Sequence, residues 1–209
     1  MQKNKYSLVW NPNPPVTPAQ LAAVAVAAGV YVILCWVGVI ALPTGFFNVS
    51  ALFVAVGFGI PFIIWFGGWG FLIGFLGGFL GAGLLVGTPI LVAIPFGFGD
   101  FFQMGIPFFA YRLLAPRFGL DQLGRDVYTR KGFLFFLLTA VLPNNLIGAL
   151  YGVWILILGG LIPVEAFWPS VIAWWFGNCV VTVVIAPIIM RGLSSVVERL
   201  GLTIHGIIT

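Results

Sequence analysis

Charged side chains are scarce in this sequence, and their scarcity excludes a soluble domain. Of its 209 residues, 7% are charged and 61% are hydrophobic, whereas a soluble domain carries about a quarter of its residues as charges. From Tyr6 to Gly99 the chain contains no Asp, Glu, Lys, Arg or His. About 20 apolar residues suffice for a helix to cross a bilayer, so this stretch alone predicts several membrane-spanning helices.

Histidine, cysteine and acidic residues are few and scattered, which argues against an enzyme. The single histidine is His205, and the two cysteines, Cys35 and Cys179, lie in separate apolar runs. The five acidic residues form no cluster in the sequence, which also lacks a phosphate-binding loop and a nucleophile-elbow motif. We therefore expect no enzymatic activity, no catalytic residues, no metal site and no cofactor. The net charge of +4 is spread over loops, so we expect no nucleic-acid partner.

The basic residues fall into three groups that set the expected topology. They lie at the amino end, in a central loop at residues 112–131 and at the carboxyl end. Loops rich in Lys and Arg stay on the cytoplasmic side of a membrane, so an even number of crossings separates each group from the next. The 93 residues from 19 to 111 then fit four helices, and the 59 residues from 132 to 190 fit two.

The sequence thus predicts an all-α, polytopic integral membrane protein with about six transmembrane helices and both termini in the cytoplasm. Residues 1–18 are expected to form a Pro-rich cytoplasmic segment, residues 19–190 a single membrane domain, and residues 191–209 a short cytoplasmic tail. Five spans with one re-entrant segment are the alternative. We expect a multi-pass protein of the cytoplasmic (inner) membrane. Proline and glycine breaks place the six spans at 19–42, 46–65, 69–87, 90–114, 132–159 and 166–190.

Small residues spaced four apart predict helix faces that allow close packing. Helix backbones approach closely across Gly and Ala, and such contacts hold helices together in lipid, where no hydrophobic force does so. Packing within this bundle and docking of another membrane subunit are both open interpretations of these faces. The residues proposed to pack against a partner helix are Ala19, Ala23, Ala27, Gly70, Gly74 and Gly78.

Asp100 is the first charged residue after Lys5, and it lies within an expected span. Arg112 follows 12 residues later, roughly 18 Å along a helix, so Asp100 falls near the middle of the membrane. At that distance we interpret Arg112 as a cytoplasmic anchor of the helix. A carboxylate at this depth costs a few kcal/mol unless a partner compensates it. The alternatives are a structural hydrogen bond to an amide on another helix and a ligand-linked or proton-linked role.

Other polar side chains in the expected spans complete a candidate ligand site. Gln103 lies three residues after Asp100, on nearly the same helix face. Asn144 and Asn145 follow Pro143, where amides can also restore backbone hydrogen bonds that a proline removes. The candidate ligand-binding residues are Asp100, Gln103, Asn144, Asn145, Asn178 and Trp174.

Four stretches of the chain form an ordered pattern. They are PFIIWFGGWGFLIGFLGGFLG, GFGDFFQMGIPFFAYRLLAPRFG, RDVYTRKGFLFFLLTAVLPNN and FWPSVIAWWFGNCVVTVVIAPIIMR. A Gly-rich span, a Gly-polar pair, a basic loop and a closing helix with a Trp-Trp pair resemble membrane-associated sensor domains of the MASE type, over roughly residues 46–190. The family commonly has Asp where Asn178 stands, so the resemblance carries no charge to that position. It implies a sensor that signals through a separate partner.

The length, the six spans and the Ala-rich first helix are also similar to the substrate-binding S components of energy-coupling-factor transporters. That similarity implies a capture subunit whose first helix docks a coupling membrane protein. We therefore expect a non-enzymatic membrane module that binds a small molecule for uptake. The alternatives are a structural or accessory subunit of a larger membrane complex and a MASE-like sensor. The expected partners are the lipid bilayer, other membrane subunits and a small-molecule ligand.

Overall fold

The computed structural model describes residues 5–10, 16–41, 43, 45 and 49–208. Within these residues the regular structure is helical, apart from an isolated bridge between Pro43 and Ser50. The α-helices are α1 (Pro18–Ala41), α2 (Ala55–Phe66), α3 (Gly68–Leu76), α4 (Ile90–Phe109), α5 (Arg130–Phe136), α6 (Leu142–Leu158) and α7 (Phe167–Arg199).

Short π-helical and 3-10 turns join some of these helices into longer apolar runs. The π-helical turns are η1 (Gly77–Gly81), η3 (Ala110–Leu114) and η5 (Leu137–Val141). In the described part of the chain, five runs are long and apolar enough to cross a membrane. The prediction of an all-α, polytopic membrane protein is thereby confirmed. The five runs are Pro18–Ala41, Gly68–Val86, Ile90–Phe118, Arg130–Leu158 and Val164–Arg199.

The prediction of a helix at 46–65 is wrong for the first half of that range. Residues 46–48 lie outside the described residues, residues 49–54 are not helical, and α2 begins only at Ala55. With 12 residues, α2 is roughly 18 Å long, shorter than the ~30 Å hydrocarbon core of a bilayer. The second passage therefore consists of a non-helical segment followed by a short helix, close to the re-entrant alternative.

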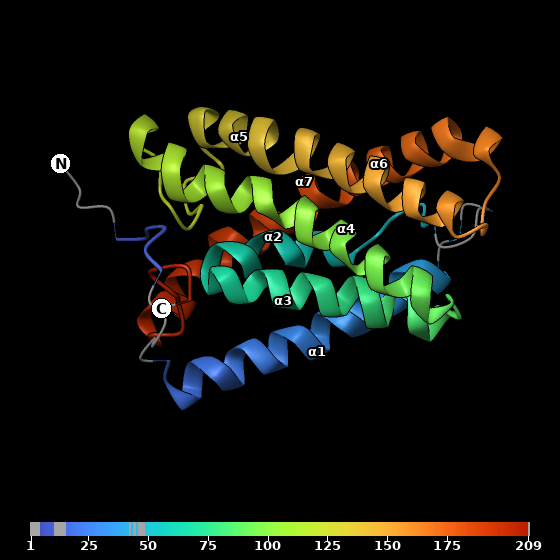
Figure 1. Ribbon diagram of the computed structural model, residues 1–209. Coiled ribbons are helices and arrows are strands. Elements are labelled where there is room, and N and C mark those ends of the chain that lie inside the picture. The colour runs from blue at the N-terminus through green and yellow to red at the C-terminus, as the bar shows by residue number, and fades with distance from the viewer. Residues whose placement is uncertain (1–4, 11–15, 42, 44, 46–48, 209) are drawn as a thin grey trace.

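The helices run back and forth along one bundle (Figure 1). The described segments next to the two chain ends lie at one end of this bundle, as does the loop between α4 and α5, and these three segments carry the described basic residues. Ion pairs join the three segments there, because Glu198 contacts Lys5 at 2.8 Å and Arg125 at 2.7 Å. We call this the basic end of the bundle, and the opposite end carries the α6–α7 connection.

Helix α2 lies at the centre of the bundle, where it contacts α1, α3, α4 and α7. All of its residues except Phe58 are buried, as expected for a helix that is apolar on every side. Glycine residues allow α2 and its neighbouring helices to approach one another closely. A Cβ on Gly57 would lie 2.6 Å from Cβ of Ile185 on α7, and one on Gly70 would lie 2.6 Å from Cα of Ile63.

The glycine face predicted on α3 and η1 packs against the chain's own helices. A Cβ on Gly74 would lie 2.8 Å from the sulfur of Met104, and one on Gly78 would lie 3.0 Å from Cα of Gly97. On α1, Ala27 is buried, Ala23 is half-buried and Ala19 is exposed. Docking of a partner subunit on either face stays a prediction.

Arg112 joins the two ends of the chain at the basic end of the bundle. It is 3% exposed and donates hydrogen bonds to the carbonyl oxygens of Ile204 and His205, both at 2.6 Å, and of Ser7 at 3.3 Å. Its guanidinium also lies 5.1 Å from the ring centre of Tyr6. Arg112 is therefore a buried clamp on both terminal segments, a role that its interpretation as a cytoplasmic anchor of the helix did not include.

The clamp makes the carboxyl-terminal segment sensitive to pH through His205. Burial, followed by the positive charges of Lys5 and Arg112, lowers the pKa of His205 below its usual 6.5, and Glu198 opposes this weakly. The docked segment therefore favours neutral imidazole, so its docking is intact above pH 6.5 and weakens as the pH falls through that value. We expect amide hydrogen exchange at residues 204–206 to accelerate between pH 7.5 and 5.5, after correction for intrinsic exchange rates.

A His205→Gln variant removes the titrating group and keeps a hydrogen-bonding side chain. Its corrected exchange rates at residues 204–206 should be equal at the two pH values. A pH response that persists in this variant would assign the effect to another group. Tyr6, whose ring packs edge-on against His205, has its pKa raised by burial and does not titrate in this range.

Candidate functional site

Asp100 lies in the interior of the bundle, within the long run Ile90–Phe118. Asp100 is 5% exposed, and its Oδ2 accepts a hydrogen bond from the hydroxyl of Tyr31 at 3.2 Å. The thiol of Cys35, one turn further along α1, lies 3.9 Å from the same oxygen. The partner of Asp100 is therefore a tyrosine and not the amide considered from the sequence. No ion pair in the described part of the chain includes Asp100.

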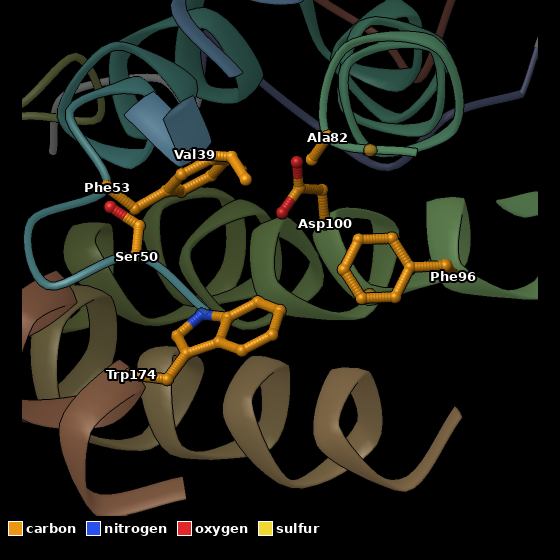
Figure 2. Close-up of a pocket in the computed structure, with 9 residues that line it drawn as sticks. Val39, Ser50, Phe53, Ala82, Phe96, Asp100 and Trp174 are labelled. Carbon is orange, nitrogen blue, oxygen red and sulfur yellow. The ribbon is translucent and has the colours of Figure 1, made fainter. Parts of the chain in front are cut away.

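A small cavity lies beside the Asp100 carboxylate (Figure 2). Its volume is about 10 Å³, about what one water molecule needs. Aromatic side chains supply much of its wall, and the segment that precedes α2 supplies another part. The lining residues are Val39, Ser50, Phe53, Gly78, Ala82, Phe96, Gly99, Asp100 and Trp174.

The non-helical segment before α2 forms part of the cavity wall and is held between α1 and α7. Ser50 donates a hydrogen bond to the carbonyl oxygen of Gly38 at 2.6 Å, which ties the segment to α1. On its other side, the segment lies against Gly177 of α7, where a Cβ would fall 2.0 Å from the carbonyl oxygen of Ala51. Ser50 and Phe53 of the segment are buried, whereas Ala51 and Leu52 are exposed, so one side of the segment packs inside the bundle and the other faces outward.

A row of polar side chains on α7 leads to this cavity. The residues are spaced four apart, so they share one face of the helix, and each is at most 8% exposed. Trp174 occupies the second position, and Figure 2 shows its indole nitrogen directed toward the segment before α2. We call this set the α7 polar row. It consists of Ser170, Trp174, Asn178 and Thr182.

Several polar atoms in and beside the α7 polar row have no hydrogen-bond partner among the described residues. A buried polar atom without a partner costs about 1–3 kcal/mol, so water or a ligand is expected beside such atoms. These atoms mark the places in the interior where water or a polar ligand is expected. The atoms are Ser170 Oγ, Trp174 Nε1, Asn178 Oδ1 and Nδ2, Asn144 Oδ1 and Nδ2, and Gln103 Oε1.

The remaining predicted site residues form an amide cluster between α4, α6 and α7. Gln103 donates to Oδ1 of Asn145, and Asn145 donates to Oγ1 of Thr182 at 3.2 Å. Asn145 also donates to the carbonyl oxygen of Val141 at 2.8 Å, one turn before it, and not to that of Thr139, whose helical donor Pro143 removes. Gln103 thus faces α6, whereas Asp100 faces α1, so the two do not share neighbours.

Sequence analysis missed four residues that belong to this site. Tyr31 and Cys35 are four apart on the first helix, where few other side chains can form hydrogen bonds. Ser170 and Thr182 stand four residues before Trp174 and four residues after Asn178. That spacing on a helix that is otherwise largely apolar was the signal available in the sequence.

The described residues contain no group of three or more His, Cys, Asp or Glu side chains that could hold a metal ion. The site therefore offers one carboxylate, aromatic walls and neutral polar groups. Comparisons of the chain with family models, with curated proteins and with solved structures find no match.

Proposed function

We propose that the protein is a non-enzymatic membrane module that captures a small monovalent cation, with ammonium as the best fit, for uptake. The observation that carries this proposal is the Asp100 carboxylate, which has no ionic partner in the described chain and faces a water-sized aromatic cavity at the α7 polar row. Each property of that cavity favours such a ligand.

The first property is charge. An ionised carboxylate inside a membrane protein is retained where a proton or a cation balances it. Tyr31 supplies one hydrogen bond to Asp100 but no positive charge. A cation in the cavity would provide the missing counter-charge.

The second property is the combination of aromatic side chains with a small volume. Phe53, Phe96 and Trp174 line the cavity together with Asp100, and aromatic faces attract cations when water is excluded. Ammonium is close to water in size and carries N–H donors for the carboxylate. A cavity of about 10 Å³ therefore suits ammonium better than a larger organic cation.

The third property is access from one side. The α7 polar row begins at Ser170, close to the start of α7 and opposite the basic end. Beyond Thr182 the same face continues with Ala186 and Met190, both 0% exposed. Met190 is closed over by the α4–α5 loop, because a Cβ on Gly124 would lie 2.8 Å from its sulfur. Ser170 is also 0% exposed, so burial does not distinguish the two ends. The polar side chains lie only in the half of this face away from the basic end, and we therefore propose that a ligand enters from that end.

The test is thermal stabilisation of the purified protein in detergent by ammonium chloride at constant ionic strength. A ligand that binds only the folded state stabilises it by RT ln(1 + [L]/Kd), about 2.7 kcal/mol at a hundred times Kd. We expect the melting temperature to rise with ammonium and not with tetramethylammonium, which is too large for the cavity. Asp100→Asn should fold and lose at least nine-tenths of the ammonium-dependent shift.

Glu165→Gln is the matched control, because Glu165 is an exposed carboxylate at the α6–α7 connection. It should keep the full response to ammonium. A folded wild-type protein with no ammonium-dependent shift would overturn the choice of ligand. A wild-type response in Asp100→Asn would overturn the role of the carboxylate.

The basic end fits a cytoplasmic orientation, because Lys and Arg favour that side of the membrane. With this orientation, the α7 polar row would open to the outside of the cytoplasmic membrane. An uptake subunit of this kind, similar in architecture to the S components, would pass its ligand on with the help of partner membrane subunits. The exposed outer face of α1 is available to such a partner.

A sensor is the second candidate, and one observation favours it. Asp100 and Trp174 come from two separate motifs of the MASE-type resemblance, and they line the same cavity. Occupancy of that cavity could then be signalled through a separate output protein. Ammonium binding would be common to both candidates. Transport of ammonium into vesicles that also contain the partner membrane subunits would occur only with the first.

A further inference from the structure

A long apolar groove runs along the lipid-facing side of α4 and η3, on the surface of the bundle. Its volume is about 700 Å³. Phe71 of α3 forms one side, Thr139 of η5 and Ile147 of α6 form the other, and Gly105 and Ala110 lie between the bulkier residues of α4 and η3. The groove is separate from the Asp100 cavity, and none of the residues that line it is charged.

The length of the groove matches one leaflet of a membrane. Its lining extends along the chain from Phe101 to Leu114, which is 13 residues or roughly 20 Å of helix. Half of a hydrocarbon core of ~30 Å is about 15 Å. The groove therefore accommodates a lipid chain of the leaflet on the side of the basic end, and it ends where headgroups begin.

Exposed basic side chains lie on the elements that continue from that end of the groove. Arg117 lies four residues, about one helical turn, after the groove residue Leu113. Arg130 and Lys131 begin α5, which continues into η5 with the groove residue Thr139. All three basic residues are exposed, and none of them forms an ion pair within the described chain.

The nearby acidic residues form no ion pair with these three cations in the described part of the chain. Asp121 and Glu198 both pair with Arg125, and Asp126 accepts a hydrogen bond from the backbone N–H of Asp121. Two aromatic contacts hold α5 beside the end of α4, because the ring of Phe135 packs against those of Tyr111 and Phe118. The positive charges are thus kept beside the end of the groove.

We infer that the groove binds an anionic phospholipid, with one acyl chain along α4 and its phosphate near Arg117, Arg130 and Lys131. The apolar lining favours the acyl chain of the lipid, and the three cations favour a negatively charged headgroup. Basic clusters at the membrane surface attract anionic lipids, and each Lys or Arg contributes roughly fivefold to affinity. This inference does not depend on the ligand proposed for the Asp100 cavity.

The experiment is native mass spectrometry of the purified, delipidated protein, titrated with phosphatidylglycerol or with phosphatidylcholine. We expect phosphatidylglycerol to form a defined one-to-one adduct at lower concentration than phosphatidylcholine. The triple variant Arg117→Gln, Arg130→Gln, Lys131→Gln should lower the affinity for phosphatidylglycerol by about tenfold or more. Its affinity for phosphatidylcholine should stay the same. Arg199→Gln, an exposed charge at the end of α7, is the control and should bind as the wild type does.

Gly105→Leu tests the acyl-chain half of the inference. A Cβ on Gly105 meets only the ring of Phe71 at an ordinary 3.7 Å, so the variant should fold and fill the groove. Gly29→Leu is the matched control, because Gly29 is exposed on α1 and its Cβ would meet nothing within 4 Å. Adducts should be lost in Gly105→Leu and retained in Gly29→Leu.

Two outcomes would overturn the inference. Equal affinity for both lipids, unchanged in the triple variant, would remove the headgroup site. A dimer in the mass spectrum that disappears in Gly105→Leu would assign the groove to a second copy of the chain.

Discussion

Gly177→Ala is expected to lower the melting temperature of the purified protein by roughly 10 °C. The added Cβ would fall 2.0 Å from the carbonyl oxygen of Ala51, which is a backbone atom and cannot rotate away as the end of a side chain does. Overpacking of this kind costs typically 1–3 kcal/mol, and we expect the upper end here. For a chain of this size, 3 kcal/mol corresponds to about 10 °C.

Gly192→Ala makes the same chemical change 15 residues further along α7. A Cβ on Gly192 would meet nothing within 4 Å, and alanine is favoured over glycine inside a helix by about 1 kcal/mol. This control should melt at or slightly above the wild-type temperature. Equal melting of the two variants would show that the segment before α2 does not pack on α7 as described.

Arg112→Ala should have the second large effect, a loss of about 3 kcal/mol of stability together with release of both chain ends. Hydrogen bonds to a charged group contribute about 1.5–3 kcal/mol each, and Arg112 makes them to three backbone carbonyls of the terminal segments. Limited proteolysis in detergent should cut the amino-terminal and carboxyl-terminal segments at least tenfold faster in the variant.

Two further variants define what Arg112 contributes. Arg112→Lys keeps the charge but lacks the planar group that reaches several carbonyls at once, so it should be intermediate in both measurements. Arg117→Ala removes an exposed arginine five residues away and should behave as the wild type without added lipid. Wild-type proteolysis of Arg112→Ala would show that other contacts hold the ends.

The helical architecture was largely predictable because the sequence contains both of its determinants. The long, nearly charge-free apolar runs predict helices within a membrane. The breaks predicted at Gly67, Pro89 and Pro163 fall between helices. The first half of the second passage was not predictable. Residues 46–54 read as apolar and span-like, and only packing against α1 and α7 determines that residues 49–54 are not helical.

The position of Asp100 within a long apolar helical run was predictable from the sequence, but its surroundings were not. Sequence spacing relates residues within one helix, whereas Tyr31 and Trp174 come from helices far away in the chain. The role of Arg112 was missed for the same reason. Its partners are backbone carbonyls of segments about 100 residues away, and backbone groups leave no signal in a sequence.

The central position of α2 has a consequence for how the chain is made. Helix α2 is the second helix to emerge during synthesis, yet α7, one of the helices that enclose it, is the last. With only 12 residues it is too short to insert as an independent span. A newly made chain must therefore hold α2 against α1, α3 and lipid until synthesis of α7 is complete. Enclosure of the second passage is in this sense delayed until α7 has been made, and a chain interrupted before residue 167 would have its central helix uncovered on the α7 side.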